Sequence, residues 1–424
     1  MNNFLKKIFK LKRDINLKEK SFLKIIENTK VSKIFESIEN YNDISEVRYV
    51  GGCVRKILNK ENFDDIDLAT NINPTQLKEC LNTNNISFFE TGIEHGTITA
   101  NIENKNFEIT SLRKDIETDG RHALVKYTTD WNEDASRRDF TINAIYSDKQ
   151  GNLFDPHDGA KDLKNGLVNF IGDPDKRIKE DYLRILRYVR FFLNYSKHSH
   201  KTEIKKIIKR NINGIKNLSK ERLIDELKKI ILSKGFMKLN KDDFCKEVIL
   251  IIFPQLKNLN ILNKLSKYSI GVLDKKDFIF LISLLIIDET DNSNYFLYKY
   301  NFSNENKKKI NFLKEIFGKK VDNNFFTKKN LHKIFYFNNK EYLIDLIDYQ
   351  LFKSNKSSKN LIELKKYFEK FESPLFPIKA RDIMKKYNIK EGRELGQKLK
   401  YLENLWVNNN FKISDNDVEK AFLG

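Results

Sequence analysis

The sequence changes character near Gly172, and this change constrains the fold more than any other feature. Before it, glycines separate short β-like runs that alternate with helical stretches such as Pro74–Leu81. The β-like runs are Val47–Val50, Thr97–Ile102, Phe107–Leu112 and Thr141–Ser147. After it, glycine is scarce and apolar residues recur at helical spacing. The sequence therefore predicts an α+β fold class, with a small mixed sheet and helices followed by an all-helical region.

The expected helices of the second region span nearly its whole length. They are Ile178–Leu193, Glu221–Leu232, Asp277–Ile287, Asn360–Phe371 and Gly396–Trp406. The proline-containing run Ser373–Pro377 predicts a joint before a last helical unit.

The charge of the chain favours a polyanionic partner. Its 424 residues include 78 Lys and Arg against 59 Asp and Glu, which leaves a net charge of +19. Such a surplus is typical of proteins that bind nucleic acid or an acidic membrane surface. The alternative is a biased composition, because the chain is rich in Lys, Asn and Ile.

Several classes of protein are excluded by pattern. The three cysteines form no CxxC pair and the six histidines form no HExxH, which argues against a disulfide scaffold and a cysteine-type zinc site. No apolar run approaches the roughly 20 residues of a membrane span. The basic start, MNNFLKKIFKLKR, lacks an apolar secretory core. We expect a cytoplasmic protein of bacterial type, with organelle targeting by this start as the less favoured alternative.

A turn of two glycines is the first candidate element of a site. The run from Arg48 to Arg55 predicts a strand, a tight turn at Gly51 and Gly52, and a helix that begins near Cys53. Glycines at such a turn let backbone N–H groups approach phosphate oxygens, and Arg55 can bind a phosphate through its forked guanidinium. Many strand–helix turns carry two glycines, so this element alone is weak.

Two carboxylates follow this turn closely. Asp65 and Asp67 lie two residues apart in a strand-like run, so alternation predicts that both face the same side. Carboxylates in this arrangement suit Mg²⁺, and a pair of metal ions is a common means of displacement at phosphorus. Glu108, in a predicted strand, is the candidate third carboxylate, and an edge-strand charge is the alternative for it.

A second polar group begins with two arginines. Arg138 suits a triphosphate, and Asp139 can accept a hydrogen bond from a ribose hydroxyl. Asn143 follows in the same run and completes this set of nucleotide-binding candidates. The alternative is a plain ion pair between Arg138 and Asp139 at a helix start.

The expected helix Ile178–Leu193 carries charges at a spacing of three residues. These are Asp181, Arg184, Arg187 and Arg190, and the spacing places Asp181 beside Arg184 on one helix face. A solvated charged face is the alternative.

Four motifs together resemble one family. GGCVR at 51–55, DIDLAT at 65–70, RRDFTINA at 137–144 and EDYLRILRYVR at 180–190 occur in the order and spacing of class II CCA-adding enzymes. These tRNA nucleotidyltransferases, like bacterial poly(A) polymerases, belong to the polymerase-β-like nucleotidyltransferase superfamily. The resemblance is dense over residues 48–232 and weaker at 376–406.

The resemblance implies an architecture and a set of roles. It implies a basic extension (1–22), a nucleotidyltransferase head (23–172), a helical neck (173–235), a helical body (236–372) and a tRNA-binding tail (373–424). Asp65 and Asp67 would hold catalytic Mg²⁺, while Gly52 and Arg55 would bind the triphosphate of CTP or ATP. The partner would be the 3′ end and the acceptor and T arm of a tRNA. The oligomeric state stays open.

The resemblance also assigns Asp181 and Arg184 as a protein template for the incoming base, supported by Arg187 and Arg190. Cytosine and adenine both present an amino donor beside a ring-nitrogen acceptor, which an Asp and an Arg complement. Uracil and guanine reverse this pattern, and each buried group left unpaired costs about 1–3 kcal/mol. A mobile loop at 113–126, for which a plain linker is the alternative, would couple the switch from C to A to primer length.

Three positions depart from the family pattern, and three alternatives to full CCA addition remain. Lys56 stands where an Asp is expected, Asp158 where a glycine of a turn is expected, and Ala380 where a glycine of the tail is expected.

The alternatives to full CCA addition are a poly(A) polymerase, a partial enzyme that adds only CC or only A, and an RNA-binding protein with an inactive head. The predicted reaction is attack of the tRNA 3′-hydroxyl on the α-phosphate of CTP or ATP, with release of pyrophosphate.

Overall fold

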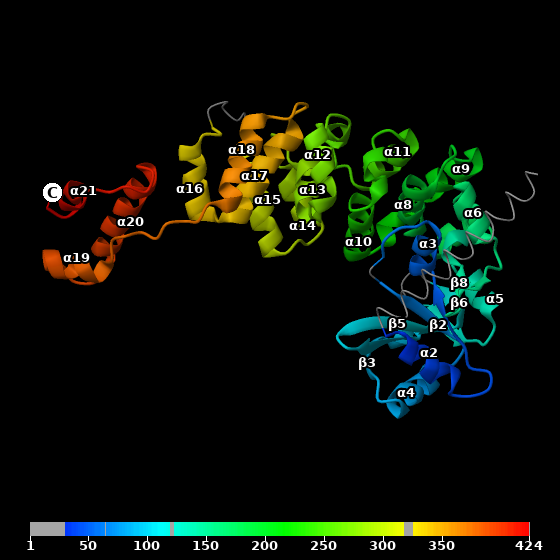
Figure 1. Cartoon of the computed structure of the whole chain (residues 1–424). Coiled ribbons are helices and arrows are strands. Elements are labelled where there is room, and N and C mark those ends of the chain that lie inside the picture. The colour runs from blue at the N-terminus through cyan, green and yellow to red at the C-terminus, as the bar shows by residue number, and fades with distance from the viewer. Residues whose placement is uncertain (1–29, 64, 119–122, 318–324, 424) are drawn as a thin grey trace, which may run out of the picture. The chain divides into compact units, whose positions relative to one another are not determined.

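A computed structural model describes residues 30–63, 65–118, 123–317 and 325–423. The chain forms two compact units, one ending at Phe236 and the other beginning at Met237 (Figure 1). The first unit contains the sheets, and the described residues of the second contain only helices. The predicted α+β class is therefore confirmed. Within the described ranges, no helix is long and apolar enough to cross a membrane.

The first unit is built on a seven-stranded mixed sheet with the order β3-β4-β5-β2-β1-β8-β9. Only the pairing of β2 with β5 is parallel. Its strands are β1 (Val47–Val50), β2 (Asp67–Thr70), β3 (Ser87–Gly92), β4 (Thr97–Ile102), β5 (Lys105–Ser111), β8 (Tyr146–Ser147) and β9 (Leu153–Phe154). A second sheet consists of the hairpin β6 (Arg113–Thr118) and β7 (Ala123–Tyr127).

The helices of the first unit precede, interrupt and follow this sheet. They are α2 (Ser32–Glu39), α3 (Gly52–Leu58), α4 (Pro74–Thr83), α5 (Trp131–Ser136), α6 (Gly159–Asn165), α7 (Pro174–Glu180), α8 (Arg184–Tyr195), α9 (Thr202–Asn211) and α10 (Lys220–Ile231). The start of α4 shows local sequence control, because Asn73 and Gln76 form a reciprocal capping box ahead of Pro74.

The two faces of the sheet bury different cores. Leu68 and Ile109 pack with residues of α2, α3 and α4 in the larger core. Ala69 packs on the opposite face against Trp131 of α5. Because side chains alternate along a strand, Asp67 and the other residues in phase with Ala69 point to the α5 face. The sheet therefore presents one closed apolar face and one face on which polar side chains are possible.

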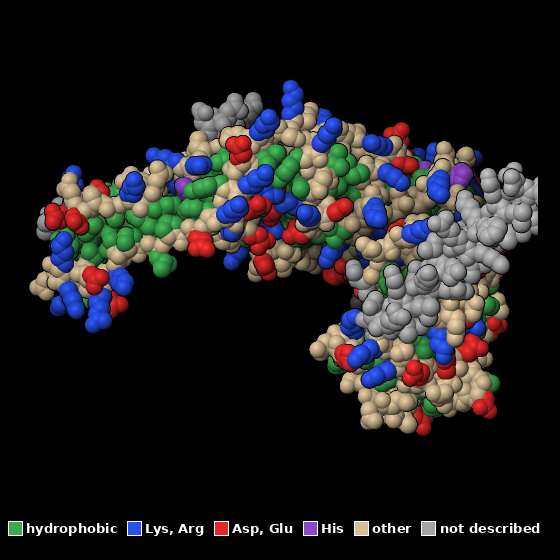
Figure 2. Space-filling model, in the orientation of Figure 1, with side chains coloured by type: hydrophobic (Ala, Val, Ile, Leu, Met, Phe, Trp, Pro, Cys, Tyr) green, Lys and Arg blue, Asp and Glu red, His purple; other side chains and the backbone are tan. Residues whose placement is uncertain are grey.

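The second unit is a succession of helices. They are α11 (Asp243–Ile252), α12 (Lys267–Val272), α13 (Phe278–Ile286), α14 (Asn292–Lys299), α15 (Asn304–Phe317), α16 (Lys328–Asn338), α17 (Lys340–Lys353), α18 (Lys359–Lys370), α19 (Ala380–Tyr387), α20 (Arg393–Asn408) and α21 (Asp415–Leu423). Residues 371–379 have no regular structure, as expected for the joint, and α19–α21 share a small core around Leu402. Figure 2 shows Lys and Arg side chains spread over the visible surface of this unit among hydrophobic ones.

Three expectations about elements were wrong. The run Thr141–Ser147 is not one strand, because Thr141–Asn143 form a 3-10 helix, η2, before the short β8. The segment expected as a loop forms the β6–β7 hairpin, and residues 119–122 of this segment lie outside the described residues. The helix expected over Ile178–Leu193 is interrupted at residues 181–183. The expected extension 1–22 also lies outside the described residues.

Candidate active site

The Gly-Gly turn lies between an acidic and a basic side chain. Gly51 has a φ of +68°, a left-handed conformation that favours glycine, and α3 begins at the next residue. A Cβ added at Gly51 would lie 3.7 Å from Arg138 Nη1, and one added at Gly52 would lie 3.7 Å from Asp67 Oδ2. The turn predicted from sequence therefore lies within contact distance of two other predicted site residues.

The three predicted carboxylates gather at the start of β2. Asp67 is the first residue of that strand, and Glu108 lies opposite it in the parallel pairing with β5. Asp65 precedes the strand, so the expectation that both aspartates lie within it was wrong. Asp67 is half-buried, whereas Asp65 and Glu108 are exposed.

The electrostatics of Asp67 report this gathering. Burial raises the pKa of Asp67, the charges of Glu108 and Asp65 raise it further, and the charges of Arg138 and Arg55 oppose the rise. A half-buried carboxylate with two further carboxylates nearby forms the kind of oxygen-donor set that a hard divalent cation stabilises. The donor chemistry of this cluster therefore fits Mg²⁺.

A hydrogen-bonded chain connects α3 to α8 through η2. Arg55 donates through Nη1 to Asn143 Oδ1, and Asn143 Nδ2 donates to Asp139 Oδ1 at 2.8 Å. Arg187 Nε donates to Asp139 Oδ2 at 2.5 Å. Burial alone would raise the pKa of Asp139, but the Arg187 charge and these hydrogen bonds hold it well below its usual range. The structure thus brings four of the predicted nucleotide-binding residues into one network.

Arg138 is held by residues that sequence reasoning missed. Its Nη2 lies 3.0 Å from Asp134 Oδ2, and its Nε lies 2.9 Å from the Tyr146 hydroxyl. The alternative in which Arg138 pairs with Asp139 is therefore wrong. The i,i+4 spacing of Asp134 and Arg138 was the available signal for their ion pair.

Asp181 and Arg184 do not share a helix face as predicted. Asp181 ends α7 with extended backbone, and its Oδ1 accepts a hydrogen bond from the Leu183 N–H at 3.1 Å, just before α8 begins at Arg184. An Asp side chain that accepts from the backbone two residues ahead competes with helix hydrogen bonding, which accounts for the interruption. Asp181 thus lies in the short connection between the two helices, and Arg184 is the first residue after it.

Each of these two residues has a different partner. Asp181 Oδ2 accepts from Arg222 Nη2 of α10 at 2.8 Å. Arg184 Nη1 donates to Glu180 Oε2 at 2.9 Å and to the Arg177 carbonyl at 3.0 Å. Neither pairing was predicted from the sequence.

Three predicted arginines surround one buried ring. The guanidinium carbons of Arg190, Arg55 and Arg187 lie 4.2, 4.8 and 5.7 Å from the centroid of Phe191. Arg190 is paired with the buried carboxylate of Glu226. Burial lowers the pKa of Arg190 against the pull of Glu226, and the nearby charges of Arg187 and Arg55 lower it further. A cluster of cations that repel one another is a site that an anionic ligand stabilises.

The departures from the family pattern have local consequences. Asp158 adopts a φ of +55°, where glycine is favoured, and the following Gly159 is so closely packed that an added Cβ would lie 2.0 Å from the Thr141 carbonyl oxygen. Lys56 lies in the last turn of α3, where its charge complements the helix dipole. Ala380 is the first residue of α19.

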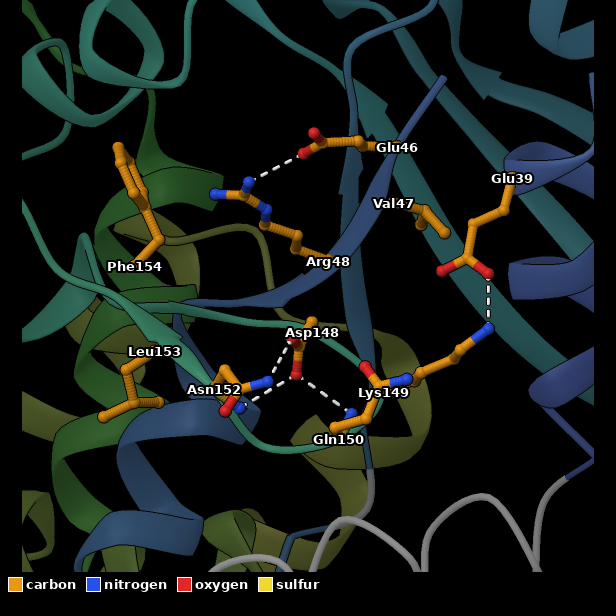
Figure 3. A pocket seen from close by; sticks show the side chains of 10 residues that line it. All are labelled: Glu39, Glu46, Val47, Arg48, Asp148, Lys149, Gln150, Asn152, Leu153 and Phe154. Atoms are coloured by element: carbon orange, nitrogen blue, oxygen red, sulfur yellow. Dashed lines mark hydrogen bonds and ion pairs between the residues drawn. The ribbon is translucent and has the colours of Figure 1, made fainter. Parts of the chain in front are cut away.

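A cavity of about 590 Å³ lies elsewhere on the first unit, beside the beginning of β1 (Figure 3). Its charged side chains pair with each other, Glu39 with Lys149 at 2.5 Å and Glu46 with Arg48 at 2.6 Å. Asp148 accepts from the Asn152 N–H. The cavity contains none of the predicted site residues.

Comparisons with known proteins bear on this site. Residues 47–169 match the family model described as the poly A polymerase head domain, and residues 201–258 match the one described as a probable RNA and SrmB-binding site of polymerase A. The chain is 34% identical over 397 residues to the mitochondrial CCA tRNA nucleotidyltransferase 1 of Homo sapiens, covering 88% of this chain and 85% of that protein. The chain belongs to the CCA tRNA nucleotidyltransferase family. The expected family is therefore confirmed.

Solved structures of CCA tRNA nucleotidyltransferases share the fold. The Bacillus stearothermophilus CCA-adding enzyme in complex with CTP matches with a TM-score of 0.68 and 18% identity over 90% of this chain and 94% of that one. The Thermotoga maritima CCA-adding enzyme complexed with tRNA matches with a TM-score of 0.58 and 17% identity over 93% and 96%. This likeness supports a shared architecture.

Proposed function

We propose that this protein adds C, C and A to the 3′ end of tRNA from CTP and ATP, without a nucleic-acid template. The observation that carries the proposal is the placement of Glu108 directly opposite Asp67, beside the Gly-Gly turn and the arginines that surround Phe191. Acidic and basic groups thus lie on either side of one turn, as the attack of a hydroxyl on a nucleoside triphosphate requires.

Asp65 and Asp67 would hold Mg²⁺, with Glu108 completing the set of carboxylates. Bound there, two such ions would supply a lowered pKa for the attacking hydroxyl and charge stabilisation for the leaving oxygens. The raised pKa of Asp67 supports this role, because a carboxylate that repels its neighbours gains most from a cation. Holding the tRNA hydroxyl close to the α-phosphate in the right orientation would itself lower the barrier to reaction.

The triphosphate would lie against Gly51, Gly52 and the arginine cluster. Arg55, Arg187 and Arg190 have partners that orient them, and each guanidinium has further N–H donors for phosphate oxygens. Asp139 is 7% exposed and binds both Asn143 and Arg187. Its main contribution is therefore to position Arg187, and a ribose hydroxyl would use the remaining acceptor capacity of its carboxylate.

Asp181 and Arg184 would read the base. Their hydrogen bonds to Arg222 and Glu180 orient them without using all of their capacity, since a carboxylate accepts about four hydrogen bonds and a guanidinium donates five. An acceptor beside a donor complements cytosine and adenine and leaves uracil and guanine mismatched. The presence of the β6–β7 hairpin supports full CCA addition, because CC-only enzymes resemble the family pattern with this segment shortened.

Poly(A) polymerase is the second candidate, because the family model matched by residues 47–169 is described by that activity. Incubation of the protein with Mg²⁺, ATP alone and a tRNA that already ends in CC separates the two. Our proposal predicts one added A, whereas a ladder of A additions would contradict it. Absence of any product with every nucleotide would support the RNA-binding alternative. A cytoplasmic location remains a prediction, and the human relative is named as mitochondrial.

The metal assignment has its own test. Asp65→Ala and Asp67→Ala should each abolish addition, because each removes a charged oxygen donor of the cation. Asp43→Ala, in an exposed loop before β1, is the matched control and should add nucleotides normally. Full activity of Asp67→Ala would rule out the proposed metal site.

A further inference from the structure

A row of four residues crosses the sheet at the level of the carboxylate site. Phe89 of β3 pairs with Thr99 of β4, Thr99 pairs with Glu108 of β5, and Glu108 pairs with Asp67 of β2. Neighbouring strands lie about 4.8 Å apart, so this row brings the backbone of Phe89 to about 14 Å from that of Asp67. Phe89 therefore lies on the edge strand in register with the carboxylates.

Phe89 points to the same face as those carboxylates. Phe88 packs against the core on the opposite face, so alternation turns Phe89 towards the face of Glu108. The Thr91 and Thr99 hydroxyl oxygens, 2.6 Å apart, confirm which face this part of β3 shares with β4. Phe89 is 55% exposed.

The next row on this face carries hydrogen-bonding groups. Ser87 pairs with Asn101, and Asn101 pairs with Asn106. Each lies two residues from a member of the first row, so all three share its face. Asn101 Nδ2 donates to Asn106 Oδ1 at 2.7 Å, and their remaining amide groups are available to a ligand. The open face next to the carboxylates thus combines one exposed aromatic ring with amide and hydroxyl groups.

We propose that Phe89 is a stacking platform for a base of the single-stranded RNA 3′ end that enters the carboxylate site. The inference rests on the proposed function, since that function requires the terminal hydroxyl to lie at Asp67. A distance of about 14 Å corresponds to roughly four nucleotides at the 3.4 Å rise of a stacked strand, and to fewer in an extended one. Every base has a face that stacks on an aromatic ring, so the contact adds affinity without sequence preference.

The competing explanation is that Phe89 is an exposed side chain without a function, because single apolar side chains on a protein surface are common. The two explanations differ in what Phe89→Ala does. Loss of a base–aromatic stack weakens RNA binding roughly fivefold to 100-fold. Loss of an uninvolved surface ring leaves RNA binding unchanged.

The first experiment measures KM values of Phe89→Ala, after circular dichroism has confirmed its fold. We expect the KM for tRNA to rise by at least about fivefold, with the KM for CTP within twofold of the wild-type value. Phe89→Trp should restore tRNA binding and Phe89→Leu should not, because stacking requires a ring. Ile44→Ala, which removes another exposed apolar side chain of this unit, is the control and should behave as wild type. A Phe89→Leu variant with wild-type KM would overturn the proposal.

The second experiment measures binding without catalysis. Equilibrium binding to a tRNA with its single-stranded 3′ end is compared with binding to the same tRNA trimmed to its last base pair. The wild type should prefer the overhang, and Phe89→Ala should lose that preference. If the wild type adds no nucleotide but shows this preference, the proposed function fails while the platform stands. If Phe89→Ala prefers the overhang as strongly as the wild type does, the stacking proposal is contradicted. It is also contradicted if the substitution changes only the self-association of the protein, measured by sedimentation.

Discussion

The Asp181 carboxylate lies 2.8 Å from Arg222 Nη2 of α10, and it does not pair with Arg184, three residues along the chain. Arg184 instead donates to Glu180 and to the backbone of α7. Two separate ion pairs, one with α10 and one with α7, therefore orient the proposed base-reading side chains. Base choice should then depend on residues that do not themselves touch the base.

Removal of Arg222 should relax base choice. In Arg222→Ala the Asp181 side chain loses one anchor, and a hydrogen bond to a charged group is worth about 1.5–3 kcal/mol. We therefore expect the ratio of kcat/KM for CTP over UTP to fall by at least about tenfold, toward the effect of Asp181→Ala. Arg210→Ala, which breaks the more exposed ion pair with Asp175, is the matched control. Unchanged discrimination in both Arg222→Ala and Asp181→Ala would remove the template role.

Magnesium should stabilise the protein through Asp67 in a pH-dependent way. The pKa of Asp67 is raised, so the folded state binds the proton of this carboxyl group more tightly than the unfolded state does. Without a cation, the free energy of unfolding therefore falls as the pH rises from the pKa of the unfolded state to that of the folded state. Mg²⁺ binds the ionised form and reverses that loss. The Mg²⁺-induced rise in Tm should therefore shrink as pH is lowered through this window, and Asp67→Asn should abolish it. Equal Tm shifts in wild type and Asp67→Asn would contradict the assignment.

The link between Asp139 and Arg187 should also contribute to stability. Asp139 is buried, so Arg187→Ala leaves a carboxylate without its cation. We expect the free energy of unfolding to fall by roughly 3 kcal/mol, the lower end for a buried pair, because Arg187 is 30% exposed. The pKa of Asp139 is lowered in the folded state. Its contribution to stability is therefore fully present above the pKa that Asp139 has in the unfolded state, and it is lost as the pH falls through the pKa that Asp139 has in the folded state. Urea unfolding at pH 7 and at pH 3 measures it, and an equal cost at both would argue against the ion pair.

Two adjacent positions of one turn should respond in opposite directions. Gly159→Ala forces a Cβ into the Thr141 carbonyl and should cost about 3 kcal/mol of unfolding free energy. Asp158→Gly relieves a left-handed backbone and should raise the unfolding free energy by up to about 1 kcal/mol. Thermal unfolding of both variants tests the pair. Destabilisation by Asp158→Gly would contradict the role given to the φ angle, and an unchanged stability of Gly159→Ala would contradict the role given to the contact.

The sequence predicted what depends on local pattern. The strand Val47–Val50, the Gly-Gly turn and the helix at Pro74 follow from alternation, glycine chemistry and capping, and each is present. The proximity of Asp67 and Glu108 was expected only as a possible completion, because pairing between strands 41 residues apart is set by the whole sheet.

The misses have tertiary or side-chain causes. The helix across Asp181 was predicted from apolar periodicity, but its carboxylate binds the Leu183 N–H and breaks the ladder. The ion pair of Asp134 with Arg138 had a local signal in its i,i+4 spacing and was still missed. Glu226 lies 36 residues from Arg190, and Arg222 lies 41 residues from Asp181. These two pairs join separate parts of the chain, and helical spacing carries no signal for such contacts.

The most direct test of the central claim is the product formed on a tRNA that lacks its 3′ CCA. The purified protein is incubated with this tRNA, Mg²⁺, CTP and ATP, and the products are resolved to single-nucleotide length and sequenced. We predict addition of C, C and A in that order, followed by a stop. Products that end in a long run of A, or no product at all, would contradict it.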